Sequence, residues 1–398
     1  MTRLKGLQMK DYWNSQLGCL KGCSEYLGIE MSESWLYGGT GVAFILSMDE
    51  QGFGAGAPWF HGPMMNLCNN LGFTVNGVYG FKSDDDFTVK QQMAWENTKN
   101  AINHGYPCYG YNLAIPEYYV VYGYESNGYL FTGYGAENQD EGDAGRIFVT
   151  PPAIKERLSV YGDEGYVPLE NDETNELLIA LAAKRGYILK GNLRMVHNGG
   201  IREIISDKGD MIVLQNDGPA LTSYQMLGTM HIGLLEMYWV EPGRRSDPRD
   251  VVKESLAFAL EHSRGPRKWV QPPYKAGLDA YELWVRAVEG SSPNIFALSY
   301  AGQCWAECRR HAASFLEESA VRIGGEPAVH LQVAGAIYRD ISAHLQVAAD
   351  LLPFEGKSAD HYMQPERLAK LAAHIRQAKM LEESGLECLK KIVAALSS

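Results

Sequence analysis

The spacing of hydrophobic positions near the start of the chain predicts a buried helix over residues 14–27. Gly28 follows where a helix C-cap is expected, and Ser32 with Glu33 is typical of a new, short helix. A glycine-rich turn at residues 37–41 then leads into the apolar run 42–46, which predicts a strand. The positions that share one helical face are Leu17, Leu20, Cys23 or Ser24, and Leu27.

The rest of the N-terminal half alternates between strand and helix patterns. Residues 63–72 read as a helix, and the acidic residues at 84–86 begin another that runs to Asn103, where they favour its positive end. The dipeptide Asn127-Gly128 is a strong hairpin signal. An antiparallel sheet facing a buried helix predicts an α+β domain. The expected strands are residues 73–81, 106–113, 118–124 and 129–132.

The second half has mainly helical patterns, so we expect an all-α domain there. Residues 133–170 are polar and irregular, which predicts two domains, 1–170 and 171–398. A helix is expected from Asn171 to Arg185. The segment 187–245 has no clear pattern and is interpreted as an insertion or a lid. The expected helices are residues 247–261, 277–289, 296–321, 327–351 and 365–396.

Composition narrows the classes of partner and compartment. The 398-residue chain has a formal net charge of −12, which argues against nucleic acid because phosphate binding needs a basic face. No stretch reaches the roughly 20 apolar residues of a membrane helix, and no signal peptide is recognised. Seven cysteines without a regular framework are typical of free thiols in a reducing compartment. The sequence therefore predicts a cytoplasmic protein with no membrane partner.

Polar residues occupy the first turn of the expected helix at 14–27. Asn14, Ser15 and Gln16 lie there, and Cys19 lies one turn further along. The N-terminus of a helix gathers unpaired N–H groups and the positive end of the dipole, which favour a thiolate or an oxyanion. This turn is the first candidate for a nucleophile or a binding group.

Two other segments offer polar side chains. The glycine-rich loop 52–62 has the composition of a cleft wall and carries His61, the one candidate for an alternative base. Along the strand at 118–124, alternation places Glu117 and Tyr119 on one face and Tyr118 on the other. A carboxylate beside tyrosine hydroxyls suits an amine-bearing ligand. The alternative is that His61 and Glu117 are ordinary surface residues.

A metal site is not expected. Cys304, Cys308 and His311 share one helical face, which would suit a thiolate–imidazole site, but buried cysteines on a helix bundle are far commoner. The H-E-x-x-H motif is absent from the sequence. No phosphate-binding glycine loop is present either, so no cofactor is expected.

Four strings of the sequence resemble one known family. The segments GIEMSESWLYGGTG and PEYYVVYGYESNGYLF, and later AGLDAYELWVRAVE and WAECRRHAASFLEE, are similar to the BtrH family of butirosin biosynthesis. The resemblance implies a papain-like domain followed by a helical domain, and an activity in acyl transfer onto aminoglycosides. It covers most of the chain, with 187–245 as the gap.

The residues that match the family's chemical positions differ from the family pattern. Counted back from Gly28, the family's cysteine falls on Ser15. Counted back from Gly123-Tyr124-Glu125, the family's histidine falls on Glu117. The resemblance implies Ser15 or Cys19 as nucleophile or transition-state donor, Glu117 as base or amine anchor, and the helix start as the oxyanion site. A carboxylate is a weak base for a hydroxyl unless it is strongly desolvated.

Two hypotheses follow from these residues. In the first, the protein is an enzyme of small-molecule biosynthesis that transfers or hydrolyses acyl or amide groups on an amine-bearing, cationic substrate. In the second, it is a papain-like scaffold that binds a metabolite without turnover, which the missing histidine favours. An acyl carrier and a second copy of the chain are compatible with the first. Its expected site comprises Ser15, Cys19 and Glu117, with Asn14, Gln16, Tyr119 and His61 at the substrate.

Overall fold

The computed structural model divides the chain into two compact units. The first comprises residues 1–28 and 76–241, and the second residues 29–75 and 242–398. The chain therefore passes between the units at three places, whereas the sequence predicted one boundary after residue 170. The structure describes residues 3–54, 60–114, 116–125, 128–134, 147–150, 166–168, 194–198, 201–205, 211–215, 220–229, 232–265, 267, 269–354 and 362–397. The helix expected at 171–185 lies outside these residues.

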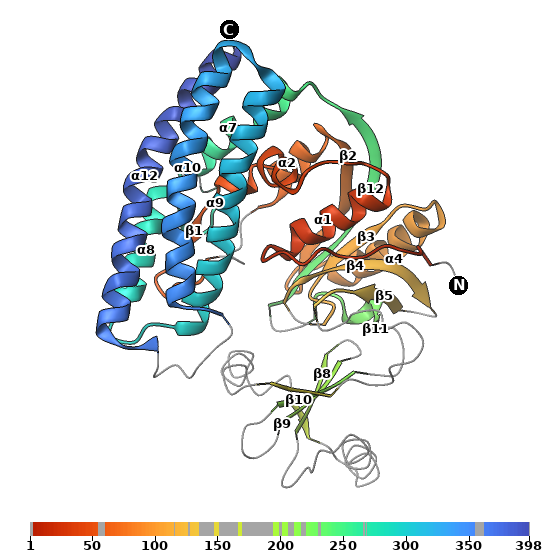
Figure 1. Ribbon diagram of the computed structural model, residues 1–398. Helices are drawn as coiled ribbons and strands as arrows, with labels where there is room; N and C mark the ends of the chain where they lie inside the picture. The colour runs from red at the N-terminus through yellow and green to blue at the C-terminus, as the bar shows by residue number, and fades with distance from the viewer. Residues whose placement is uncertain are drawn as a thin grey trace. The chain divides into compact units, whose positions relative to one another are not determined.

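A six-stranded sheet forms the core of the first unit (Figure 1). Its strand order is β11-β5-β4-β3-β12-β2. The neighbouring strands from β11 to β12 in this order pair antiparallel. Three of the expected strands are confirmed as β3, β4 and β5, and the strand expected at 73–81 is confirmed within β2. The strands are β2 (Leu71–Phe81), β3 (Cys108–Tyr111), β4 (Tyr118–Glu125), β5 (Gly128–Thr132), β11 (Ala220–Ser223) and β12 (Leu234–Arg245).

Two helices pack against this sheet. The predicted first helix is confirmed as α1 (Ser15–Tyr26), which contacts β4 and β3. The helix expected from residue 84 begins slightly later, as α4 (Phe87–Asn103), and its Trp95 packs edge-on against the rings of Tyr124 and Tyr129. The buried residues of both helices include apolar side chains, such as Leu17 and Leu20 of α1 and Ile102 of α4, and their burial stabilises the packing.

The segment that the sequence left unplaced contributes strands to both sheets of the first unit. Residues 220–223 form β11 and residues 234–245 form β12 of the six-stranded sheet, with Tyr238 of β12 opposite Tyr109 of β3. The described part of the preceding stretch contributes to a separate five-stranded antiparallel sheet, in the order β6-β10-β9-β8-β7. Its strands are β6 (Ile147–Thr150), β7 (Tyr166–Pro168), β8 (Arg194–Asn198), β9 (Ile201–Ile205) and β10 (Met211–Gln215).

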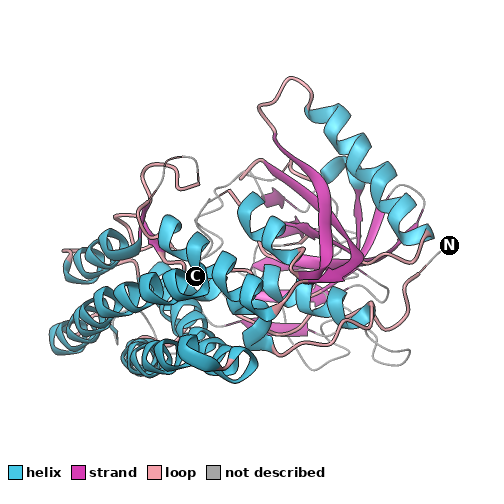
Figure 2. Cartoon of the chain, turned by 90° about the horizontal axis from the view of Figure 1, so that it is seen from above, coloured by secondary structure: helices cyan, strands magenta, loops and turns pink. Residues whose placement is uncertain are grey.

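The second unit is mainly a bundle of helices, and it contains the helices that the sequence predicted from residue 247 onward. The longest of them, α9, α10 and α12, pack side by side (Figure 1, Figure 2). A two-stranded sheet joins β1 (Ser47–Met48) to β13 (Lys275–Ala276). The helices are α2 (Glu33–Gly39), α3 (Gly62–Cys68), α7 (Pro248–His262), α8 (Gly277–Glu289), α9 (Ile295–Ile323), α10 (Gly325–Leu351) and α12 (Pro365–Ser397).

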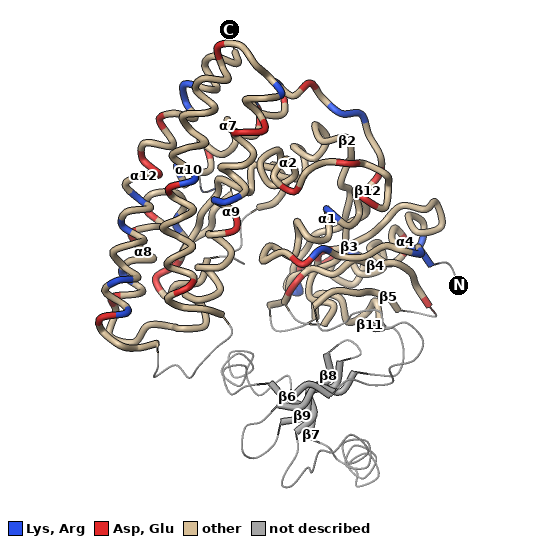
Figure 3. The backbone as a smooth tube through the Cα atoms, in the orientation of Figure 1, with Lys and Arg blue, Asp and Glu red and all other residues tan. Residues whose placement is uncertain are grey.

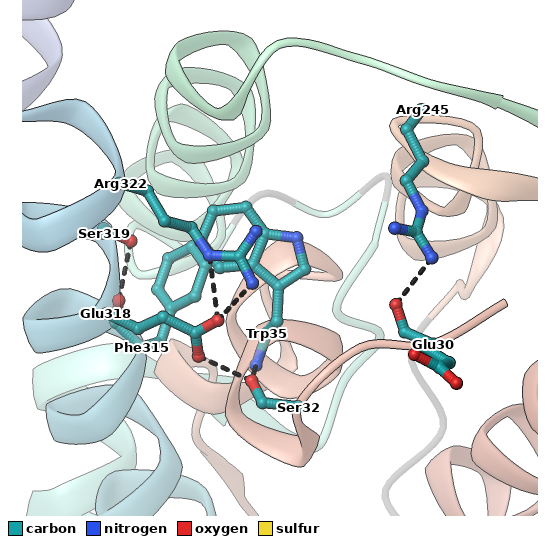
Figure 4. Close-up of polar contacts among 8 residues, drawn as sticks. All are labelled: Glu30, Ser32, Trp35, Arg245, Phe315, Glu318, Ser319 and Arg322. Atoms are coloured by element: carbon teal, nitrogen blue, oxygen red, sulfur yellow. Dashed lines mark hydrogen bonds and ion pairs between the residues drawn. The ribbon is translucent and has the colours of Figure 1, made fainter.

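A polar network fixes the start of α2 to α9 (Figure 4). The Ser32 hydroxyl caps α2 by accepting a hydrogen bond from the Trp35 N–H at 2.9 Å, and it donates to Glu318 at 2.5 Å. Arg322 donates to the same carboxylate and lies over the Trp35 ring, 3.9 Å from its centroid. The serine that the sequence predicted as a cap therefore also ties the two helices together.

Glycine allows α2 to approach α9 closely. A Cβ atom on Gly38 would lie 1.9 Å from the Phe315 ring, well inside van der Waals contact. The turn that the sequence predicted at 37–41 is therefore confined to residues 40 and 41, because residues 37–39 belong to the last turn of α2.

The apolar run 42–46 does not form the predicted strand. Residues Val42–Phe44 form a short 3₁₀ turn instead, and only Ser47 and Met48 are in strand β1. The buried Arg309 side chain donates to the carbonyl oxygens of Ala43 and Ile45, both at 2.9 Å. A guanidinium from α9 therefore satisfies these buried carbonyls in place of a neighbouring strand.

Both signs of charge are spread along the bundle helices (Figure 3). Arg376 and Lys379 of α12 pair with Glu289 and Glu282 of α8, at 2.7 and 2.8 Å. These are exposed pairs, and each adds little to stability. Within the described residues, none of the helices is long and apolar enough to span a lipid bilayer.

Candidate functional site

The first turn of α1 is positioned by its own cap. Asn14 has extended backbone angles, and its side-chain oxygen accepts a hydrogen bond from the Leu17 N–H at 3.0 Å. Asparagine is among the best residues for this role. Ser15 is consequently the first residue of the helix, at the end where the dipole is positive.

A tight connection between β3 and β4 positions Glu117. Asn112 has a positive φ of 57°, which asparagine tolerates better than most residues. Its N–H donates to the Glu117 carbonyl oxygen at 2.8 Å and closes the turn. Glu117 therefore lies directly before strand β4, beside the start of α1.

Ser15 and Glu117 meet, although 102 residues separate them in the chain. The Ser15 hydroxyl donates to Glu117 Oε2 at 2.6 Å. The same hydroxyl oxygen accepts a hydrogen bond from the Tyr118 N–H at 3.0 Å. The structure thus brings together two of the residues that the sequence selected as catalytic.

This arrangement orients the serine proton toward a carboxylate. The Tyr118 N–H and the nearby start of α1 both favour negative charge on the serine oxygen. Ser15 is 5% exposed, while Glu117 keeps partial access to solvent. A ligand can therefore reach the carboxylate more readily than the hydroxyl.

Gln16 is a buried polar side chain without a complete set of hydrogen bonds. It is 4% exposed, and within the described part of the chain its Nε2 has no acceptor in reach. An unsatisfied buried amide group costs about 1–3 kcal/mol. An acceptor atom of a ligand that bonded to Gln16 Nε2 would remove this cost.

Cys19 does not have the surroundings of an activated thiol. It is fully buried on α1, one turn beyond the helix start. Burial, and then the neighbouring Cys23 and Glu117, raise the pKa of its thiol well above the usual value. A protonated thiol is a poor nucleophile, so the structure favours Ser15 over Cys19.

Alkylation of the cysteines at neutral pH is expected to leave Cys19 among the slowest to react. All seven cysteines are described, and Cys388 alone is not buried. We therefore expect iodoacetamide to modify Cys388 first and Cys19 roughly tenfold or more slowly, as followed by peptide mass spectrometry. Cys388→Ser should remove the fast reaction. Rapid modification of Cys19 in the folded protein would restore it as the candidate nucleophile.

Tyr119 packs within the core. Its side chain is fully buried, its ring meets Phe131 at 5.2 Å, and its hydroxyl donates to the Tyr134 carbonyl oxygen at 3.2 Å. These contacts give Tyr119 a structural role on the Glu117 face of the sheet.

His61 belongs to the second unit, where it precedes α3 at the N-cap position without a side-chain capping bond. Burial lowers the pKa of its ring to about 4. The imidazole is therefore neutral at pH 7 and weakly basic. Its place at the substrate stays a prediction.

Sequence reasoning missed Glu236, a buried acidic residue on β12. It is 2% exposed and accepts hydrogen bonds from the hydroxyls of Tyr118 and of Tyr238, the latter at 2.9 Å. Burial raises the pKa of its carboxyl, the two hydroxyls oppose this, and the result is about 7. The only sequence signal was a single acidic residue inside the apolar run LLEMYWV.

The helical face with two cysteines in the second unit is held by hydrogen bonds and ring stacking. Tyr37 stacks on His311 at 4.2 Å and donates to Glu307 at 2.5 Å, and Ser34 is 3.1 Å from His311 Nδ1. In the portion of the chain that the structure describes, no three His, Cys, Asp or Glu side chains gather as a metal site.

Comparison with known proteins adds no further assignment. No family model and no curated protein matches the chain. The chemistry of the site therefore rests on its own geometry.

Proposed function

We propose that the chain is a cytoplasmic enzyme that transfers or hydrolyses an acyl or amide group of an amine-bearing small molecule. The contact between Ser15 and Glu117 supports this proposal most directly. The helix packed on an antiparallel sheet supports a papain-like fold for the first unit, and the seven free cysteines fit a reducing compartment.

In the proposed reaction, the Ser15 oxygen attacks the acyl carbonyl carbon and forms a bond to it. Its proton passes to Glu117, which lies 2.6 Å away. The bond between the carbonyl carbon and the leaving group then breaks, and the leaving group takes the proton from Glu117. An amine, or water, then attacks the ester carbonyl carbon and gives a proton to Glu117. Glu117 returns this proton to the Ser15 oxygen as the bond between that oxygen and the acyl carbon breaks, and the acylated product leaves. The start of α1 stabilises the oxyanion formed at each stage.

The partial exposure of Glu117 supports an amine-bearing substrate. An ammonium group beside this carboxylate would form a charge-assisted hydrogen bond, which contributes about 1.5–3 kcal/mol. The net charge of −12 also favours the approach of a cation.

A second function, binding without turnover, is favoured by a different observation. Ser15 is almost fully buried and its partner is a carboxylate, the weaker kind of base. In that case Glu117 would anchor a cationic metabolite, and the serine hydroxyl would only hold the carboxylate in place.

A ligand-dependent melting screen tests both functions. Amines, aminoglycosides, amino acids and acyl thioesters are added to the wild type and to Glu117→Gln. A cationic ligand should raise the melting temperature of the wild type by mass action, and its Kd should weaken roughly 10- to 100-fold in Glu117→Gln. Glu125→Gln, a change at a partly exposed carboxylate at the other end of β4, is the matched control and should bind normally.

Intact-mass measurement then separates the two functions. An enzyme incubated with an acyl thioester should gain the mass of the acyl group, and Ser15→Ala should not. A ligand that depends on Glu117 without any adduct on Ser15 identifies a binding protein. If no ligand depends on Glu117, the site is misplaced and both functions fail.

A further inference from the structure

Tyr118 connects the proposed site to a buried carboxylate. Its N–H donates to the Ser15 oxygen at 3.0 Å, and its hydroxyl donates to Glu236 Oε2. A single residue therefore contacts the serine through its backbone and Glu236 through its side chain.

Glu236 accepts hydrogen bonds from two tyrosines, and tyrosines of two further strands lie nearby. Tyr238 of β12 and Tyr118 of β4 donate to it. Tyr109 of β3 lies against both of their rings, at centroid distances of 5.1 and 6.0 Å. The pKa of Tyr79, on β2, is raised first by burial and then by the negative charge of Glu236. The charges beyond Tyr79 belong to Lys90 and Asp84, which form an ion pair at 2.7 Å.

We propose that Glu236 is a positioning residue whose ionisation sets the hydrogen bond between Tyr118 and Ser15. This inference rests on the proposed function, because it concerns the regulation of the same site. It predicts that the site has two settings, one for each protonation state of Glu236.

The two settings follow from the hydrogen-bonding capacity of a carboxyl group. Ionised Glu236 accepts from Tyr118 at one oxygen and from Tyr238 at the other. Protonation turns one oxygen into a donor, and the tyrosine O–H that faces it must then turn away. Tyr118 is buried and is the first residue of β4. In this proposal, a change at its hydroxyl alters the position of its ring and, through the ring, of its peptide group. The pKa of about 7 for Glu236 places this change near neutral pH.

The alternative is that the sheet alone fixes the Tyr118 peptide. Tyr118 pairs with Tyr111 of β3 in the antiparallel ladder, and this pairing could hold its N–H regardless of Glu236. The two explanations differ in whether the Tyr118 amide responds to pH.

The test is an NMR titration of the full chain labelled with ¹⁵N-tyrosine, from pH 5.5 to 8.5. The Tyr118 amide is assigned by its loss in Tyr118→Phe, and Ser15→Ala should shift it upfield by removing its acceptor. In the wild type, the Tyr118 amide proton should move in one step centred near pH 7. Glu236→Gln should abolish the step, and Glu117→Gln should retain it.

Tyr238→Phe tests the proposal independently, because it keeps the carboxyl group but removes one donor to its ionised form. The midpoint of the step should rise by roughly one pH unit. A Tyr118 amide that does not move, or a step that persists in Glu236→Gln, would overturn the inference. No ligand is needed, so this outcome is separate from that of the melting screen, which can fail or succeed on its own.

Discussion

Replacing Glu382 with alanine is expected to lower the free energy of unfolding of the second unit by about 3–5 kcal/mol. Glu382 is 1% exposed and forms an ion pair at 2.8 Å with Arg309, which is equally buried. The hydroxyls of Tyr281 and Tyr338 donate to the same carboxylate at 3.0 and 3.2 Å. Removal of Glu382 leaves a buried positive charge without its counter-ion. Urea denaturation followed by circular dichroism measures the loss.

The neighbouring Glu383 provides the control for this change. It is exposed on the same helix, α12, so Glu383→Ala should alter stability by less than about 0.5 kcal/mol. Arg309 also holds the carbonyl oxygens of Ala43 and Ile45, so the loss should include loosening of the 3₁₀ turn. A loss below about 1 kcal/mol in Glu382→Ala would contradict this account of the buried pair.

Glu236→Gln is expected to remove a pH-dependent loss of stability. The pKa of Glu236 is raised in the folded protein from 4.5 to about 7, chiefly by burial. Between these values the folded state binds more protons than the unfolded state, so stability falls as pH rises. The proton on Glu236 therefore contributes to the free energy of unfolding. This contribution is fully present below about pH 4.5 and is lost as the pH rises through 7. The wild type should lose roughly 3 kcal/mol over this range relative to the glutamine variant.

Denaturation curves of both proteins at several pH values between 4.5 and 8 measure this difference. Glu96→Gln, at an exposed position of α4, should follow the wild type at every pH. Parallel pH profiles for the wild type and Glu236→Gln would show that Glu236 ionises normally in the folded state.

The sequence predicted the elements that local signals specify. Asn14, Ser32 and Asp247 were all expected to begin helices, and each accepts a capping hydrogen bond from its own helix. The hairpin between β4 and β5 followed from one Asn-Gly pair. Caps and tight turns depend on a few neighbouring residues, so the sequence displays them directly.

Strand β12 could not be predicted in the same way. Its pairing with β3 joins Tyr238 to Tyr109 across more than a hundred residues. The environment of Glu236 depends on tyrosines of other strands, such as Tyr118, so the local sequence of β12 does not show it. The strand predicted at 42–46 was wrong for a similar reason, because the side chain of Arg309, distant in the sequence, bonds to carbonyl oxygens of this run.

The site was predicted in part. The resemblance to a family, rather than the chemistry of the residues, predicted that Ser15 and Glu117 share a site. In the structure the Ser15 hydroxyl lies 2.6 Å from Glu117 Oε2. The burial of Cys19 depends on how α1 packs against the sheet, and a local reading of helical spacing does not show it. The pairing of Tyr118 with Glu236 needed the sheet order.

The place of β12 in the sheet has a consequence for synthesis on the ribosome. Strand β3 ends at Tyr111, but the strand that covers one of its edges ends at Arg245. At about 5–20 residues per second, that edge stays without β12 for on the order of 10 seconds while the intervening chain is made. An uncovered strand edge invites pairing with other chains. During this interval the nascent protein is most in need of chaperones, because the edge of β3 is exposed. A fragment that ended before β12 would keep this edge exposed.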